Sequence, residues 1–206
     1  MDEQYYEKLL NIKTCGEQKG FNDSLHYHRY EPTSYLALNT LIKEYSFTES
    51  DSLIDFGCGK GRLNFFINNT SGSYVTGIEM NSYYYDICMD NMNNYLKHDK
   101  RSNKEKIHFF KCLAQEYEIS SIDNKFYFFN PFSLQIFMCV VNNILDSVDQ
   151  YQRTIDIILY YPSDEYIFYL ENSTCFSLYK EIPVLPHYSK DSRSRFLIYR
   201  LDYTSA

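Results

Sequence analysis

The stretch that decides the fold is Leu53-Ile54-Asp55-Phe56-Gly57-Cys58-Gly59-Lys60-Gly61-Arg62. It starts as an apolar strand that contains an acid, and it continues into a glycine-rich turn before a helical pattern begins. Glycine tolerates positive φ and has no side chain, so this turn lets backbone approach a ligand closely. Glu79 stands 20 residues beyond Gly59, at the end of the next predicted strand, where a carboxylate can hold both hydroxyls of a ribose. These features predict a nucleoside pocket at the carboxyl edge of a parallel sheet.

Short apolar runs and helical patterns alternate along the chain on both sides of this turn. The patterns predict strands over 52–56, 74–80, 107–112, 125–129 and 154–160, and helices over 63–68, 84–95, 134–148 and 164–172. Such alternation indicates parallel strands joined by crossover helices. Two further strands are predicted over 175–182 and 194–201, and two helical patterns lie ahead of the first strand, over 2–13 and 38–45.

The length of 206 residues fits one core, and no internal repeat or interdomain linker is visible. We therefore expect a single domain over residues 1–206, in which residues 1–50 form a helical cover. The formal net charge of −7 disfavours a long electrostatic track for nucleic acid, because phosphate neutralisation needs clustered Lys and Arg. The mostly basic run 97–106 is a local exception that keeps an RNA acceptor open.

The cysteines and the N-terminus predict a reduced, cytoplasmic setting. Six Cys are spread without a C-x-x-C pair, and the chain lacks a basic start followed by an apolar run. Residues 126–145 carry no charge and are about as long as a membrane span, but Asn130-Pro131 interrupts them, so no span is predicted. The pair His26 and His28 has no acidic or thiol partner at ligand spacing, and we expect no metal site.

With this turn and Glu79, the chain resembles the class I S-adenosylmethionine-dependent methyltransferases, in which an acid-x-Gly-x-Gly-x-Gly turn binds the cofactor. The resemblance runs from about Tyr30 to Leu201. It implies an α/β fold, a Rossmann-like sandwich with a seven-stranded, mostly parallel sheet, a C-terminal antiparallel strand pair and helices on both faces. It also implies methyltransferase activity with S-adenosylmethionine as the cofactor.

The resemblance assigns the cofactor site to particular residues of this chain. The amino-acid end of the cofactor would be lined by Asp55, Gly57, Cys58, Gly59 and Gly61. Glu79 would hold the ribose, with Met80 in the same site. The adenine would be flanked by Leu113, Ala114 and Gln115, although many relatives have an acidic residue at this place.

A second motif, Phe129-Asn130-Pro131-Phe132, stands at the end of the fourth predicted strand. In the family, an Asn/Asp-Pro-Pro-Tyr/Phe motif accepts hydrogen bonds from a target amino group through the Asn side chain and a proline carbonyl. The aromatic ring of that motif packs against the target. The resemblance therefore implies N-methylation with Asn130, Pro131 and Phe132 as catalytic residues and Asn130 also beside the cofactor, although this chain has one Pro where the family has two.

Three residues ahead of the first strand, Tyr30, Thr33 and Tyr35, would form a lid over donor and acceptor. Packing explains these residues equally well. Likewise, Asn130-Pro131 can be a turn that ends the strand and caps the following helix.

Three functional alternatives remain open. A dinucleotide site of the dehydrogenase type would need glycine where Arg62 stands, which disfavours an oxidoreductase. A binding module could keep the S-adenosylmethionine pocket without catalysis. For a methyltransferase, we expect a protein side chain or a small molecule as the acceptor, with rRNA or tRNA as the alternative.

Overall fold

The computed structural model describes residues 3–16, 30–98 and 104–203. Its seven strands are β1 (Ser52–Phe56), β2 (Tyr74–Ile78), β3 (Ile107–Phe110), β4 (Lys125–Phe128), β5 (Ile155–Tyr160), β6 (Ser177–Pro183) and β7 (Arg195–Leu201). They form one sheet in the order β3-β2-β1-β4-β5-β7-β6. Strands β1 to β5 pair in parallel, whereas β7 is antiparallel to both β5 and β6. The predicted mostly parallel sheet with an antiparallel C-terminal pair is confirmed.

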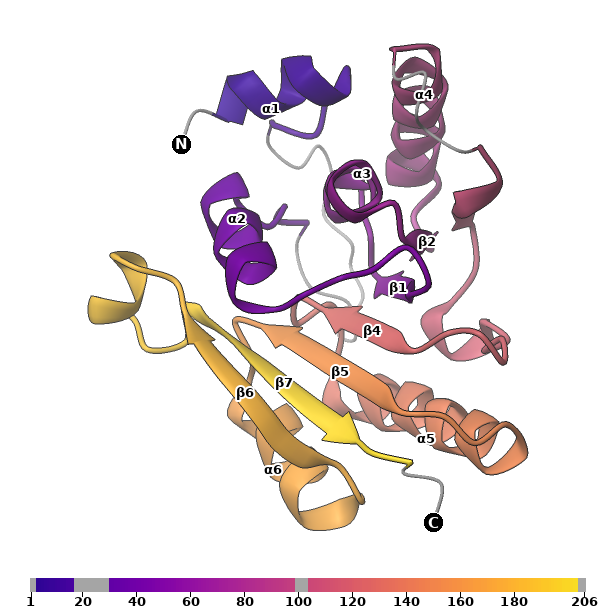
Figure 1. Cartoon of the computed structure of the whole chain (residues 1–206), viewed down its shortest axis with the longest axis vertical. Helices are drawn as coiled ribbons and strands as arrows, with labels where there is room; N and C mark the ends of the chain where they lie inside the picture. The colour runs from indigo at the N-terminus through magenta and orange to yellow at the C-terminus, as the bar shows by residue number, and fades with distance from the viewer. Residues whose placement is uncertain (1–2, 17–29, 99–103, 204–206) are drawn as a thin grey trace.

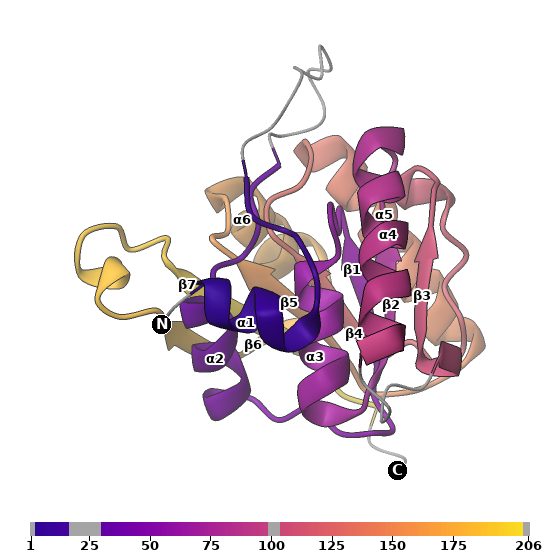
Figure 2. The same ribbon diagram turned by 90° about the horizontal axis from the view of Figure 1, so that it is seen from above.

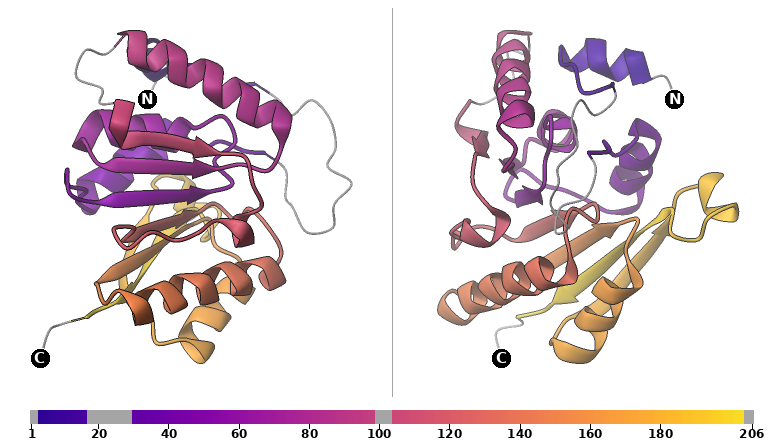
Figure 3. Two further views of the ribbon diagram at one scale, coloured as in Figure 1. Left: turned by 90° about the vertical axis from the view of Figure 1, so that its right-hand side faces the viewer. Right: turned by 180° about the vertical axis from the view of Figure 1, so that it is seen from behind.

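Helices cover both faces of this sheet, as predicted (Figure 1). The α-helices are α1 (Glu3–Leu10), α2 (Tyr35–Glu44), α3 (Arg62–Ser71), α4 (Ser82–His98), α5 (Leu134–Gln150) and α6 (Asp164–Ser173). The described residues also form the short 3-10 helices η1 (Lys104–Lys106), η2 (Ala114–Glu116) and η3 (His187–Ser189). Figure 2 shows α2, α3 and α4 side by side, and Figure 1 shows α1 on the outer side of α2 and α3. Figure 3 shows α5 and α6 on the opposite side of the strands.

The strands alternate their side chains between two separate cores. In β1, Leu53 packs in the core under α1 to α4, and its neighbour Ile54 packs in the core under α5 and α6. This period of two follows from the pleat of the strand. Because both faces are covered, all five residues of β1 are buried. Asp55 lies on the same face as Leu53, toward α1 to α4.

Glycine and serine set the ends of the helices near the site. Helix α3 begins after Gly61 and ends before Gly72, and both glycines have left-handed φ angles, of 83° and 71°. Glycine adopts this conformation at no steric cost. Helix α2 begins after Ser34, whose hydroxyl accepts the Ala37 N–H at 3.2 Å.

A buried arginine ties the N-terminal helix to the start of α3. Arg62 is 4% exposed, and its Nη1 lies 2.6 Å from Glu3 Oε2. Its Nε donates to Thr14 Oγ1 at 2.7 Å, and its guanidinium lies 4.6 Å from the Tyr35 ring centroid. Because Arg62 directly follows the glycine turn, these contacts bring α1 and the residues after it next to that turn.

The uncharged stretch 126–145 divides between β4 and α5. Within the described ranges, no helix is both long and apolar enough to cross a membrane. Over the same ranges, no three His, Cys, Asp or Glu side chains are grouped so that they could hold a metal ion. His26 and His28 lie outside the described residues.

Candidate functional site

The glycine turn sits at the carboxyl edge of the sheet, between the ends of β1 and β2. Gly57, Gly59 and Gly61 have φ angles of 83°, 56° and 83°, which L-amino acids with a side chain rarely adopt. The backbone N–H groups of Gly57 and Cys58 both donate to Ile78 O, at 2.9 and 3.0 Å. The turn is therefore pinned to the last residue of β2.

Glu79 is buried against this turn. One carboxylate oxygen, Oε2, accepts the Gly59 N–H at 2.9 Å, and the other, Oε1, accepts the Asn81 N–H at 2.7 Å. Burial raises the pKa of Glu79, while the backbone N–H groups oppose that rise. The predicted ribose acid thus joins the turn to the start of α4, and the half-buried Met80 follows it.

Asp55 is 4% exposed and lies between Gly77 of β2 and Tyr127 of β4 in the sheet register. Burial, reinforced by the Glu79 carboxylate, raises the pKa of Asp55 to about 8. At neutral pH the carboxyl group is therefore mostly protonated. A cation bound nearby would favour its ionised form.

Tyr30 covers the turn. A methyl group on Gly59 would overlap the Tyr30 ring, so the ring rests on the glycine backbone. The Tyr30 hydroxyl donates to Thr14 O at 2.9 Å, and the ring stacks on Tyr84 with centroids 4.7 Å apart. Tyr30 is thus held in place from two sides, by the N-terminal segment and by α4.

The other two predicted lid residues lie deeper. Thr33 is 5% exposed and shares a hydrogen bond of 2.6 Å with the Tyr127 hydroxyl, while Tyr35 is fully buried beneath Arg62. Their contacts are with the protein interior. Only Tyr30 of the three touches the glycine turn.

The two motifs singled out in the sequence are in contact. A Cβ placed on Gly57 would lie 2.8 Å from Pro131 Cβ, so the proline packs directly on the turn. Asn130, which precedes it, has a left-handed φ of 43°, a conformation that Asn tolerates better than most residues. The turn after β4 therefore carries Asn130 to the same edge as Gly57.

Phe132 points elsewhere. It is 2% exposed, its ring lies 6.1 Å from that of Phe128, and its carbonyl accepts a hydrogen bond from the Tyr166 hydroxyl. The Phe132 ring belongs to the core under α5 and α6, whereas Asn130 and Pro131 are partly exposed.

Phe129, which precedes Asn130, packs in an aromatic cluster with Tyr160 and Tyr161, two residues that sequence reasoning did not assign to the site. The Phe129 ring lies 4.7 Å from Tyr160 and 6.4 Å from Tyr161. Tyr161 has a left-handed φ of 50°, which is rare for a bulky residue, and the Arg193 guanidinium lies 4.6 Å from its ring centroid. Tyr160 is the last residue of β5, and Phe129 and Tyr161 directly follow β4 and β5. Because the carboxyl ends of parallel strands meet at one edge of the sheet, their positions at the strand ends could have predicted this cluster.

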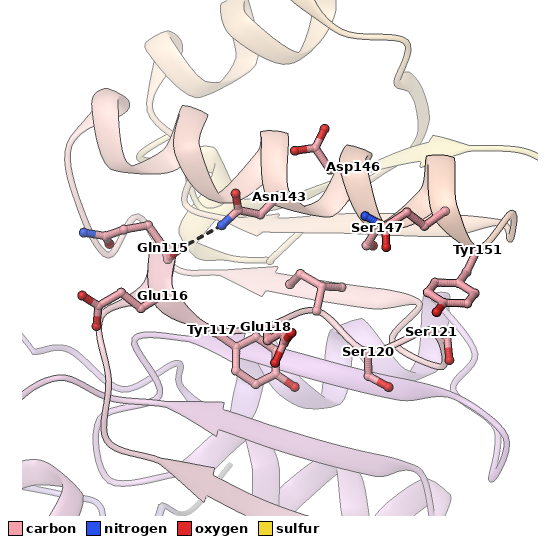
Figure 4. Close-up of a pocket in the computed structure, with 12 residues that line it drawn as sticks. Gln115, Glu116, Tyr117, Glu118, Ser120, Ser121, Asn143, Asp146, Ser147 and Tyr151 are labelled. Atoms are coloured by element: carbon pink, nitrogen blue, oxygen red, sulfur yellow. Dashed lines mark hydrogen bonds between the residues drawn. The ribbon is translucent and has the colours of Figure 1, made fainter.

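Of the predicted adenine residues, Ala114 and Gln115 lie in η2, and Leu113 directly precedes it. Ala114 is 7% exposed, and Gln115 O accepts the Asn143 Nδ2 group at 2.9 Å (Figure 4). Gln115 Oε1 is buried and has no hydrogen-bond partner in the part of the chain that the structure describes. A buried acceptor without a donor is costly, so this oxygen suits a ligand N–H group.

A groove of about 770 Å³ extends from Gln115 along α5 to Tyr151 (Figure 4). Its walls are the segment 115–121 and the second half of α5. The glycine turn does not line this groove. The groove is therefore a separate feature from the pocket that the turn would line.

Comparisons with known proteins support the fold. No protein-family model matches the sequence, and neither does any curated protein sequence. Among solved structures, a proposed RNA methyltransferase from Pyrococcus horikoshii aligns over 99% of this chain and 100% of its own, with a TM-score of 0.61 at 17% identity.

Two solved structures with bound S-adenosyl-L-homocysteine align at a TM-score of 0.54. One is an RNA methyltransferase from Salinibacter ruber, 14% identical, covering 85% of this chain and 98% of its own. The other is a geranyl diphosphate C-methyltransferase from Streptomyces coelicolor, 12% identical, covering 82% and 79%. With the strand order and the antiparallel C-terminal pair described above, the chain has the fold of the class I S-adenosylmethionine-dependent methyltransferases.

Proposed function

We propose that the protein is an S-adenosylmethionine-dependent methyltransferase that methylates a nitrogen atom. The observation that carries this proposal is the contact between Pro131 and Gly57, which sets Asn130 beside the glycine turn. The fold supports it, since solved structures of this fold include methyltransferases with bound S-adenosyl-L-homocysteine.

The residues around the turn fit the cofactor. S-adenosylmethionine supplies an electrophilic methyl group on a sulfonium, attached to a nucleoside and an amino-acid tail. Glu79 offers a carboxylate for the ribose hydroxyls, and Asp55 offers one for the ammonium of the tail. The buried Gln115 Oε1 is an acceptor suited to the amino group of adenine. The exposed Gly57 leaves backbone open to the ligand.

Asn130 would act by orienting the acceptor. Its amide oxygen can accept an N–H from the acceptor amine, which leaves the nitrogen lone pair free to attack. Because the Phe132 ring lies in the core, we assign packing against the acceptor to Phe129 and the anchoring of the motif to Phe132. Tyr161, whose ring lies 6.4 Å from that of Phe129, would help to exclude water.

For the acceptor, we favour a protein side chain or a small molecule. The net charge is −7, and the half-buried Lys106 of the basic run donates to Gly72 O at 2.9 Å, so that cation is already bound by a backbone carbonyl. RNA is the second candidate, because two of the compared structures are described as RNA methyltransferases. Whichever acceptor is used, we propose that the chain is one domain in which residues 1–50 form a helical cover.

The test measures transfer from methyl-labelled S-adenosylmethionine to three separate pools, namely total RNA, total protein and small molecules. We expect label on nitrogen in one pool, identified by mass spectrometry after digestion. Asn130→Ala should lower transfer about a hundredfold, as loss of orientation does. It should leave S-adenosyl-L-homocysteine affinity within about threefold, since an orienting residue acts mainly on the transition state.

Asn172→Ala, on the exposed side of α6, is the matched control and should transfer normally. Label on carbon or oxygen, or full activity of Asn130→Ala, would contradict N-methylation through Asn130. Cofactor binding without transfer to any pool would favour the non-catalytic module.

A further inference from the structure

Lys60 is a buried lysine inside the glycine turn, between Gly59 and Gly61. It is 6% exposed, and Asn91 Nδ2 fixes its backbone by donating to Lys60 O at 3.1 Å. Its Nζ donates to Cys15 O at 3.3 Å and lies 5.0 Å from the centroid of the Tyr30 ring. Across the described residues, no carboxylate lies within 4.0 Å of this ammonium group.

This environment leaves a positive charge poorly compensated. An ammonium group has three donors, and here one carbonyl and one aromatic face receive them. Burial lowers the pKa of Lys60, as expected when the charged form is the less favoured one. Buried charges in proteins are normally paired.

The nearby acids are engaged by another residue. Glu3 Oε2 and Glu7 Oε1 lie 2.6 and 3.6 Å from the guanidinium nitrogens of Arg62. Two cations therefore stand within three residues of each other, and one of them takes both carboxylates. Among the residues that the structure describes, no acid is therefore left to pair with Lys60, and its ammonium group can accept an anionic ligand.

The position of Lys60 indicates which anion. Tyr30 lies over its ammonium group and also rests on Gly59, so the charge sits at the turn proposed to hold the cofactor. S-adenosylmethionine has one anionic group, the carboxylate of its amino-acid tail. We propose, on the basis of the proposed function, that Lys60 Nζ binds this carboxylate and selects ligands that carry it.

The test compares two ligands that differ in that carboxylate alone, S-adenosyl-L-homocysteine and its decarboxylated analogue S-adenosyl-3-thiopropylamine. Calorimetry on the wild type should show that S-adenosyl-L-homocysteine binds at least about tenfold more tightly than the decarboxylated analogue, since hydrogen bonds between charged groups are the strong ones. Lys60→Met should remove this preference by weakening S-adenosyl-L-homocysteine, with the analogue changed less than about twofold. Lys60→Arg should retain most of it.

Lys43→Met, at an exposed position of α2, is the control and should bind both ligands as the wild type does. Unchanged affinity of Lys60→Met for S-adenosyl-L-homocysteine, or equal weakening for both ligands, would overturn the proposal. Binding of S-adenosyl-3-thiopropylamine by Lys60→Met shows whether the pocket of that variant is intact. If Lys60→Met does not fold, Lys60→Gln takes its place in the same experiment. A wild type that binds neither ligand would instead reject the proposed function.

Discussion

Gly59 donates its backbone N–H to the carboxylate of Glu79 at 2.9 Å, and this bond joins the glycine turn to the end of β2. The same carboxylate accepts the Asn81 N–H at 2.7 Å. An acid placed to hold a ribose therefore also fixes the backbone that faces the cofactor. Stability and cofactor binding should be linked at this residue.

Glu79→Ala tests that link. The change leaves the Gly59 and Asn81 N–H groups without their acceptor, which should lower the free energy of unfolding by about 1–3 kcal/mol. It should also weaken S-adenosyl-L-homocysteine binding about tenfold or more, measured by calorimetry alongside urea unfolding. Glu118→Ala, at an exposed position, should change neither quantity. Normal binding by Glu79→Ala would argue against its role at the ribose.

Asp55 predicts a pH dependence of stability. Its pKa of about 8 in the folded protein lies far above its value of about 4 in an unfolded chain. Between these values the folded state binds the proton more strongly, so the free energy of unfolding should fall as pH rises from about 4 to about 8. Asp55→Asn should flatten this fall in urea unfolding at several pH values, with a residual slope from Glu79. Parallel curves for both proteins would exclude Asp55 as the source.

The fold could be read from the sequence because both faces of the sheet are covered. A strand such as β1 is then apolar throughout and stands out between turn residues. The predicted ends of the strands and helices were less accurate than their positions. The strand predicted over 74–80 ends at Ile78, since Glu79 turns its carboxylate back to the glycine turn. Helix α3 continues to Ser71, beyond its apolar pattern, until Gly72 ends it.

From the sequence, only those site residues could be placed that directly follow the predicted strands. That Gly57 and Pro131 share one edge follows from parallel β1 and β4. The direction of the Phe132 ring did not follow, because a shift of one residue after a strand moves a side chain to the other face. The partnership of Arg62 with Glu3 joins residues distant in sequence, and no local pattern indicates it.

Gly59→Ala should be destabilising for two reasons. Alanine at a left-handed φ of 56° costs roughly 1–2 kcal/mol, and its methyl group would overlap the Tyr30 ring. In the double variant Tyr30→Ala/Gly59→Ala the overlap is absent, so its loss of unfolding free energy should be smaller than the sum of the two single losses. Additivity within about 0.5 kcal/mol would contradict contact between Tyr30 and Gly59.

Arg62→Met should detach the N-terminal helix. Removing one partner of a buried ion pair costs about 3–5 kcal/mol, and we expect the lower end because Glu3 is 39% exposed. Urea unfolding gives the loss, and hydrogen exchange should show reduced protection in α1. For comparison, Lys180→Met breaks an exposed pair with Glu44 and should cost less than about 1 kcal/mol. Equal losses in the two variants would rule out a special role for Arg62.

The central claim is that the turn from Asp55 to Gly61, with Glu79, holds S-adenosylmethionine. Titration of the pure, folded protein with S-adenosyl-L-homocysteine in a calorimeter tests it most directly. We predict saturable binding at one site per chain and a matching rise in melting temperature, with no such rise from NAD(H). Absence of binding heat and an unchanged melting temperature, in a protein that unfolds cooperatively, would contradict the account.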